Sequence, residues 1–138
     1  MPQPPNPYDF LPSVPVFEVQ SNDVSDGEML SLPQVSGIFG AGGEDVSPHL
    51  AWTGAPEDTK SYAVTCFDPD APTGSGFWHW VVYDIPNQIS ELSTGAGSQD
   101  GDLLPMGAKQ VKNDAGLYGY LGSAPPSGHG MHRYMFAV

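Results

Sequence analysis

The sequence predicts a mainly β domain, an antiparallel sandwich or barrel with little helix. Glycine and proline number 17 and 15 among the 138 residues, which is too many for a bundle of long helices. The apolar residues gather in short β-branched and aromatic runs, and no stretch has the spacing of an amphipathic helix. A chain of this length can bury a core without disulfides, and none can form within it, because Cys66 is its only cysteine.

The first third of the chain carries weak strand signals. Residues 1–13 are rich in proline and predict an extended N-terminal arm, followed by a single domain over residues 14–138. Short strands are expected over residues 14–19, 28–32 and 49–52. The Gly-rich stretch before the third of these, GIFGAGGED, lacks the G-K-[ST] ending of a phosphate-binding loop and opens no helix. We interpret it as a structural loop.

The strongest strand signals lie in the middle of the chain. The run SYAVTCF at residues 61–67 leads into a Pro- and Gly-rich loop, DPDAPTGSG. The run FWHWVVYDI at residues 77–85 predicts a central strand that is buried on both faces. Two further strands are expected, LYGYL at residues 117–121 and HRYMFAV at residues 132–138, with the loop GSAPPSGHG between them.

The charge of the chain limits its partners. Four Lys and Arg residues stand against 16 Asp and Glu residues, a net charge of −12. Nucleic acids and anionic membrane surfaces require a basic patch, so neither is expected as a partner. No secretory signal and no apolar stretch of membrane-spanning length is found. We therefore expect a cytoplasmic protein without integral membrane association, in which an anion binds only in a local pocket.

Polar residues within or beside the apolar strands are the candidates for such a pocket. Asp68 ends one strand, His79 lies within another, and His132 and Tyr134 share a face of the last. Because buried polar groups need hydrogen-bond partners, we expect these four residues to lie together and contact one another. Two imidazoles and a phenol would then donate to an anion, while Asp68 orients one ring. A histidine on a strand can equally be a satisfied core residue.

The same alternation of strand faces predicts the surroundings of the neighbouring residues. Trp78 and Trp80 lie opposite His79 and are expected in the core. Arg133 lies opposite the face of the anion donors, and since a buried guanidinium needs a carboxylate, Asp70 is its expected partner. Cys66 is expected to be a small buried apolar residue.

Two other chemistries are less well supported. His129 and His132 stand three residues apart and could join the other polar residues in a metal site, but Gly130 between them argues against the helix that would give this spacing meaning. Ser123 or Ser127 could act as a nucleophile beside His132, yet the chain lacks the G-x-S-x-G motif.

Two long motifs carry a family resemblance. DPDAPTGSGFWHWVVYDIP at residues 68–86 and YLGSAPPSGHGMHRYMFAV at residues 120–138 resemble the phosphatidylethanolamine-binding protein family, especially its bacterial Raf-kinase-inhibitor-like (YbhB/YbcL) branch. The resemblance spans nearly the whole chain. It implies an antiparallel β-sandwich with little helix and a small anion-binding pocket at one end. Relatives usually continue with a further strand and a C-terminal helix, which we expect this chain to lack.

The resemblance also implies roles for individual residues. It assigns ligand binding to Asp68, Pro72, His79, Pro125, Pro126, His132 and Tyr134. Asp70 and Arg133 provide structural support. Ala124 stands where many relatives have glycine, so its methyl group is expected to narrow the pocket slightly.

These observations together predict a binding protein and not an enzyme, with no metal or other cofactor. The expected ligand is a small phosphate-type anion, such as phosphoethanolamine, a phospholipid headgroup or a phosphorylated side chain. Because members of the family also bind proteins, the first alternative is an inhibitor of a kinase or protease. The second is a weak hydrolase that uses Asp68 and the two histidines as acid–base groups. If the C-terminal segment is missing, the apolar residues it leaves exposed favour a homodimer.

Overall fold

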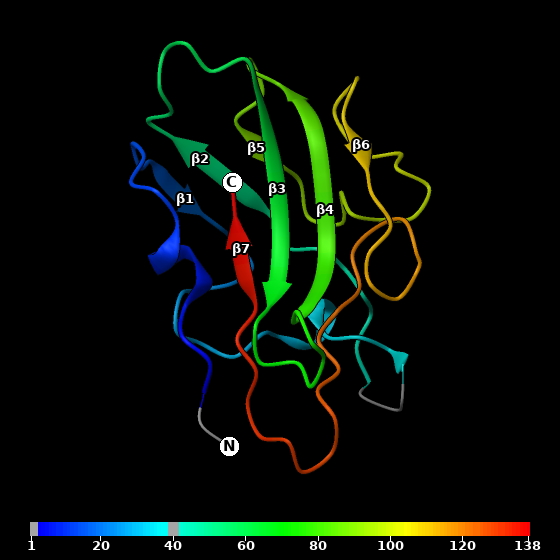
Figure 1. Cartoon of the computed structure of the whole chain (residues 1–138). Coiled ribbons are helices and arrows are strands. Elements are labelled where there is room, and N and C mark those ends of the chain that lie inside the picture. The colour runs from blue at the N-terminus through cyan, green and yellow to red at the C-terminus, as the bar shows by residue number, and fades with distance from the viewer. Residues whose placement is uncertain (1–2, 39–41) are drawn as a thin grey trace.

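The strongest sequence signals form the centre of the molecule. In the computed structural model, which describes residues 3–38 and 42–138, Ser61–Asp68 (β3) and Phe77–Pro86 (β4) pair antiparallel along their length. Lys109–Gln110 (β6) pairs with the free edge of β4, and Met135–Ala137 (β7) pairs with the free edge of β3. The result is a four-stranded sheet with the order β6-β4-β3-β7, seen across the front of Figure 1.

A second antiparallel sheet packs against the first. It consists of Glu18–Gln20 (β1), Leu50–Thr53 (β2) and Glu91–Leu92 (β5), in the order β1-β2-β5. Its strands lie behind the four-stranded sheet in Figure 1. The prediction of an antiparallel sandwich with little helix is confirmed.

Apolar side chains from both sheets form one core. Its largest buried members are Leu50, Trp52, Val64, Cys66, Trp80, Val82, Ile85 and Leu92. Full burial of a side chain of this kind contributes about 1.5–3 kcal/mol relative to its exposure. Cys66 packs here as the small apolar residue that was expected, and its burial raises the pKa of the thiol, which keeps it protonated.

A β-bulge at His79 changes the predicted alternation of β4. Cys66 pairs with Trp80 and Phe67 with Trp78, so His79 is an extra residue on β4. His79 and Trp80 are therefore both buried, whereas Trp78 is 36 % exposed and its ring packs, tilted by 37°, against that of Phe67, with the ring centroids 4.4 Å apart. The prediction for Trp80 is confirmed and that for Trp78 is wrong, because strict alternation ends at the bulge.

The outer face of β4 is only partly covered. Tyr83 and Asp84 are exposed, and Asp84 forms a surface ion pair with Lys109 at 3.1 Å. The expectation that this run is buried on both faces is thus wrong at its far end, because Tyr83 and Asp84 are exposed there.

Two expected strands have other structures. The stretch 28–32 is not a strand, and it leads into a 3₁₀ turn at Leu32–Gln34 (η2), whose second residue is a proline that fixes a turn-like φ. The stretch 117–121 is not a strand either. Tyr120 N–H donates to the carbonyl of Gly97 and Leu121 N–H to that of His79, so its backbone bonds go to two segments and not to one partner strand.

The first and last strands of the domain are also shorter than predicted. The first strand begins at Glu18 instead of residue 14, and the last strand covers only Met135–Ala137 of the run 132–138. The N-terminal arm contains a 3₁₀ turn, Pro7–Phe10 (η1), so it is not fully extended. Its residues 1–2 and residues 39–41 of the Gly-rich stretch lie outside the described residues. Among the described residues, no helix is long and apolar enough to cross a membrane.

Candidate functional site

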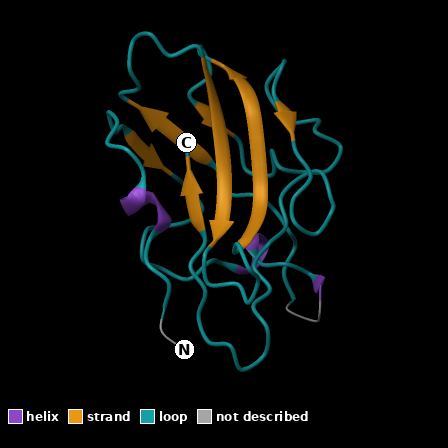
Figure 2. Cartoon of the chain, in the orientation of Figure 1, coloured by secondary structure: helices purple, strands orange, loops and turns teal. Residues whose placement is uncertain are grey.

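The loops that carry the predicted site residues gather at one end of the sandwich. The β3–β4 loop and the segment before β7 lie at the lower end of the molecule in Figure 1, and Figure 2 shows that this end is built almost entirely of loops. Between them lies a cavity of about 240 Å³. All seven residues expected to bind a ligand line it: Asp68, Pro72, His79, Pro125, Pro126, His132 and Tyr134. The two sequence motifs thus meet in one cavity.

The β3–β4 turn holds Asp68 in place. The Asp70 N–H donates to Asp68 Oδ1 at 2.8 Å, which closes an Asx turn directly after the strand. Gly76 ends the loop at a φ of 74°, and a Cβ there would lie 2.5 Å from the Phe67 ring. Only glycine fits this position without displacement of the ring or backbone. The carboxylate of Asp68 is therefore placed by backbone geometry.

Asp68 and His132 form a buried pair. His132 Nδ1 lies 2.7 Å from Asp68 Oδ2, and each side chain is only 3 % exposed. Because a carboxylate accepts, the ring carries its proton on Nδ1. Water is nearly excluded from the pair, so its electrostatic interaction is much stronger than that of a surface pair.

His79 is held by the backbone and not by Asp68. Its Nδ1 donates to the Leu121 carbonyl at 2.8 Å, and its ring packs between Phe77 at 4.8 Å and Tyr134 at 5.1 Å. Burial lowers the pKa of His79, which favours the neutral ring. A neutral ring with its proton on Nδ1 has a bare Nε2, so it accepts a hydrogen bond and does not donate one. This differs from the expectation that both imidazoles donate.

Tyr134 supplies a hydroxyl donor. Burial, reinforced by the charge of Asp68, raises the pKa of the phenol. The hydroxyl is consequently protonated throughout the physiological range and can donate to an anion.

Apart from Thr73, the remaining residues that line the cavity are apolar. Pro72, Pro125 and Pro126 line it together with Ile38 and Phe77. Prolines have no N–H to offer a ligand. A few polar groups on apolar walls are typical of a pocket that selects a small ligand.

Arg133 lies beside the site but is occupied by Asp70. Its Nε and Nη2 donate to the two Asp70 oxygens at 3.0 and 2.9 Å, and its backbone N–H donates at 2.7 Å. These hydrogen bonds hold the pKa of Asp70 below its usual value. The structure forms the ion pair that the sequence predicted, and the pair joins the β3–β4 loop to the segment before β7.

His129 is a residue whose position was not predicted. Its Nδ1 lies 2.9 Å from His132 Nε2, on the side of the ring opposite Asp68. In the sequence it stood out only as a possible metal ligand. Within residues 3–38 and 42–138, no group of three or more His, Cys, Asp or Glu side chains could hold a metal ion. The flanking glycines of G-H-G were the available signal of a special turn.

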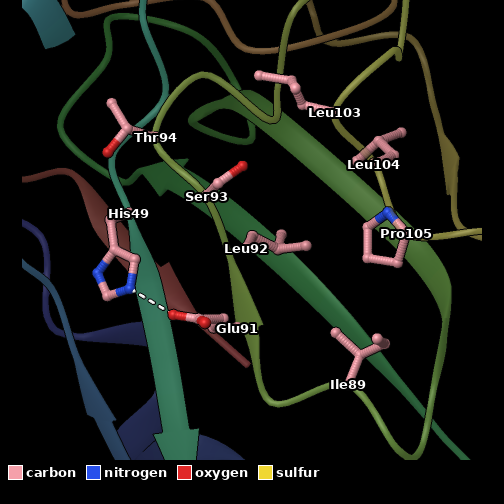
Figure 3. A pocket seen from close by; sticks show the side chains of 9 residues that line it. All are labelled: His49, Ile89, Glu91, Leu92, Ser93, Thr94, Leu103, Leu104 and Pro105. Atoms are coloured by element: carbon pink, nitrogen blue, oxygen red, sulfur yellow. Dashed lines mark hydrogen bonds and ion pairs between the residues drawn. The ribbon is translucent and has the colours of Figure 1, made fainter.

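A second, larger hollow lies beside β2 and β5. It has a volume of about 550 Å³, and Figure 3 shows His49 and Glu91 on one side and Leu103, Leu104 and Pro105 on the other. His49 Nε2 bonds Glu91 Oε2 at 2.9 Å, and its Nδ1 accepts from the Asn22 N–H at 3.0 Å. Both ring nitrogens are therefore satisfied within the protein. We regard this cleft as structural.

Comparisons with known proteins agree with the geometry. The sequence profile described as "Phosphatidylethanolamine-binding protein" matches residues 20–138. YbcL of Escherichia coli is 48 % identical over 129 residues, which cover 94 % of this chain and 70 % of the relative. YbhB of the same organism is 49 % identical over 118 residues, 86 % of this chain and 73 % of the relative.

Two solved structures are also similar. The crystal structure of E. coli YbcL, described as a new member of the mammalian PEBP family, superposes with a TM-score of 0.85 at 50 % identity, over 87 % of this chain and 73 % of that one. A putative phosphatidylethanolamine-binding protein homologue from Chlamydia trachomatis gives a TM-score of 0.69 at 28 % identity, over 87 % of this chain and 71 % of that one.

Proposed function

The chain belongs to the phosphatidylethanolamine-binding protein family, and on that premise we propose that it is a binding protein for a small phosphate-type anion. The ligand would occupy the cavity formed by the ends of β3 and β4 and the segment before β7. The observation that carries this proposal is the buried Asp68–His132 pair, with Tyr134 beside it, in a cavity whose walls are mostly apolar.

The size of the cavity supports a headgroup-sized ligand. Its volume of about 240 Å³ lies just below the range of about 300–1,000 Å³ that is typical of sites for drug-sized molecules. Inorganic phosphate, phosphoethanolamine, a phospholipid headgroup and a phosphorylated side chain share the phosphoryl group that we propose is recognised. With a net charge of −12, the chain as a whole repels such anions, so the affinity must come from the local donors.

We propose binding without turnover. The hydrolase alternative uses Asp68 and the two histidines as acid–base groups, and His132 can take a proton from a substrate only at a ring nitrogen that is free. His132 has the carboxylate partner, but its other nitrogen contacts His129. This arrangement supports a binding role over the alternative of a weak hydrolase.

A protein-interaction inhibitor is the second candidate function. Met131, which is 78 % exposed, and Ile38, which is 39 % exposed, stand beside the site. A phosphorylated side chain bound in the cavity would bring its own protein against these apolar residues. Such contacts would add affinity for a partner without any change in the pocket chemistry.

Calorimetric titration tests the proposed function. Phosphate and phosphoethanolamine should bind the wild-type chain near pH 6 and more weakly near pH 8, because a protonated imidazole attracts an anion and a neutral one does not. His132→Gln should weaken binding at least about tenfold, because it removes the Asp68–His132 hydrogen bond that organises the site and the imidazole that can carry positive charge beside the ligand. The matched control is His49→Gln, which removes the histidine of the other His–carboxylate pair and should leave binding unchanged.

The same proteins distinguish the alternatives. A folded wild-type chain that binds neither ligand near pH 6 contradicts the proposal. Hydrolysis of a chromogenic phosphate or acyl ester that is lost in His132→Gln would favour the hydrolase. Binding of a phosphorylated protein that survives His132→Gln would favour the protein-interaction inhibitor, whose partner would contact Met131 and Ile38 beside the site.

A further inference from the structure

We infer that His129 is a further ligand-binding residue of this pocket, and that a phosphoryl dianion binds there together with one proton taken up by the His129–His132 pair. This inference rests on the proposed function. It adds a residue to the site and specifies the charge state in which the site accepts its ligand.

The local backbone is shaped to bring His129 onto His132. Gly128 and Gly130 flank it with φ values of 78° and 80°, and a Cβ at either position would meet no atom within 4 Å. Glycine is thus required by the backbone conformation and not by crowding. The His129 N–H donates to the Pro126 carbonyl at 3.1 Å, which closes the turn. The two imidazole rings then meet edge to face, with centroids 5.1 Å apart.

A count of protons shows that the His129–His132 pair, with both rings neutral, has no free N–H group to donate to an anion. Two neutral imidazoles carry two N–H groups. One is the His132 Nδ1–H that donates to Asp68, and the other lies between His132 Nε2 and His129 Nδ1. Both protons are used inside the protein. A third proton on the pair supplies the first N–H that is free to donate to a ligand.

The charges around the pair lead to the same requirement. Asp68 carries a full negative charge, while Asp70 and Arg133 neutralise each other. The titratable neighbours His79 and Tyr134 are held neutral in the buried wall. With both imidazoles of the pair neutral, the site has a net charge of −1 and repels a dianion. One added proton brings the site to zero.

Exposure makes His129 the natural entry point for this proton. His129 is exposed, whereas the side chain of His132, which it contacts and which lines the cavity, is only 3 % exposed. The exposed ring can exchange protons with water, and the buried ring transmits the charge to the cavity. A phosphate monoester, whose second pKa lies near 6, can instead arrive with its own proton and reach the same complex by the other route.

Sulfate separates the two sources of the proton, because it remains a dianion at neutral pH and brings none. We would titrate the full chain with sulfate and with phosphate by calorimetry near pH 7, in several buffers of different ionisation enthalpy. The dependence of the heat on the buffer counts the protons taken up. For sulfate, the wild-type chain should take up about one proton per ligand, and its affinity should fall about tenfold per pH unit above neutrality.

The variants assign the proton to His129. His129→Asn keeps a polar side chain at an exposed position, so it should fold normally, but it should reduce proton uptake on sulfate binding to well below one and flatten the pH profile. Gly130→Ala should have the same effect in weaker form, because it disturbs the turn but keeps the ring. His49→Gln is the control and should behave like the wild type.

Each outcome has a distinct meaning. If the wild-type chain binds both anions without proton uptake, or if His129→Asn takes up as many protons as the wild type, the inference is overturned while the proposed function stands. If the wild-type chain binds neither anion, the proposed function fails and the inference fails with it.

Discussion

Two regions of this molecule join a histidine to a carboxylate at nearly the same distance, one through Nε2 and the other through Nδ1. His49 and Glu91 meet at 2.9 Å beside β2 and β5, and His132 and Asp68 meet at 2.7 Å at the end of β3. Their surroundings differ, because the Glu91 side chain is 64 % exposed and that of Asp68 is 3 % exposed. Exposed ion pairs contribute about 0–1 kcal/mol. Breaking a buried pair costs about 3–5 kcal/mol, since it leaves an uncompensated polar group.

The two hollows differ in the same way. The cleft at His49 is more than twice as large as the cavity at His132, at about 550 against about 240 Å³. Its histidine is nevertheless bonded on both nitrogens by its own chain, one of them to a backbone N–H. At His132 the second nitrogen meets only another imidazole, which can change its charge. The comparison shows that burial and proton-exchangeable partners, rather than volume, mark the candidate site.

The largest expected effect comes from breaking the buried pair. Asp68→Ala should destabilise the fold by about 3 kcal/mol, because the His132 Nδ1–H and the Asp70 N–H both lose their acceptor, and should abolish phosphate binding. Glu91→Ala, the matched change at the exposed pair, should cost less than about 1 kcal/mol. Urea denaturation of the three proteins near pH 7 measures both values. Equal destabilisation by the two substitutions would remove the distinction between the regions.

A smaller effect is expected from the glycines that shape the site. Gly76→Ala places a Cβ 2.5 Å from the Phe67 ring and 2.7 Å from the Asp68 carbonyl oxygen, at a positive φ. We expect a loss of about 2–3 kcal/mol, the sum of a left-handed backbone penalty and a clash. Gly128→Ala meets open space and should cost only the backbone penalty, about 1–2 kcal/mol.

Thermal or urea unfolding of the two glycine variants tests this order. If Gly128→Ala were the more damaging change, the β3–β4 loop at Gly76 would adapt to a methyl group more easily than the turn at Gly128, contrary to the geometry. Phosphate titration adds a second readout, because Gly76→Ala should also displace Asp68 and weaken binding, while Gly128→Ala acts through His129.

How far the sequence predicted this site depends on the range of the interactions. Asp68, His79, His132 and Tyr134 were found because each is polar within or beside an apolar strand, and alternation placed His132 and Tyr134 on one face. The same reasoning failed for Trp78, because the bulge at His79 is set by pairing with β3, which no single strand reveals. It also missed the ring contact of His129, since that depends on a glycine turn whose geometry the letters G-H-G do not specify.

The smallest expected effect is a pH dependence of stability that distinguishes His79 from His49. In the unfolded chain His79 takes up a proton near pH 6.5, whereas in the folded chain burial lowers its pKa and the ring stays neutral. Between these two values the unfolded state binds more protons, so the free energy of unfolding rises with pH and falls as the pH drops below about 6.5. Asp70, whose pKa is also lowered, affects stability only below about pH 4. Urea titrations between about pH 5 and pH 7.5 therefore isolate the histidines.

His79→Gln, whose amide can still donate to the Leu121 carbonyl, should flatten this pH dependence of the free energy of unfolding. His49→Gln should retain the part of the pH dependence that comes from His79. An unchanged slope in His79→Gln would mean that the buried ring accepts a proton as readily as a free one, and that the wall of the pocket is not the neutral surface that the proton count at His129 and His132 requires.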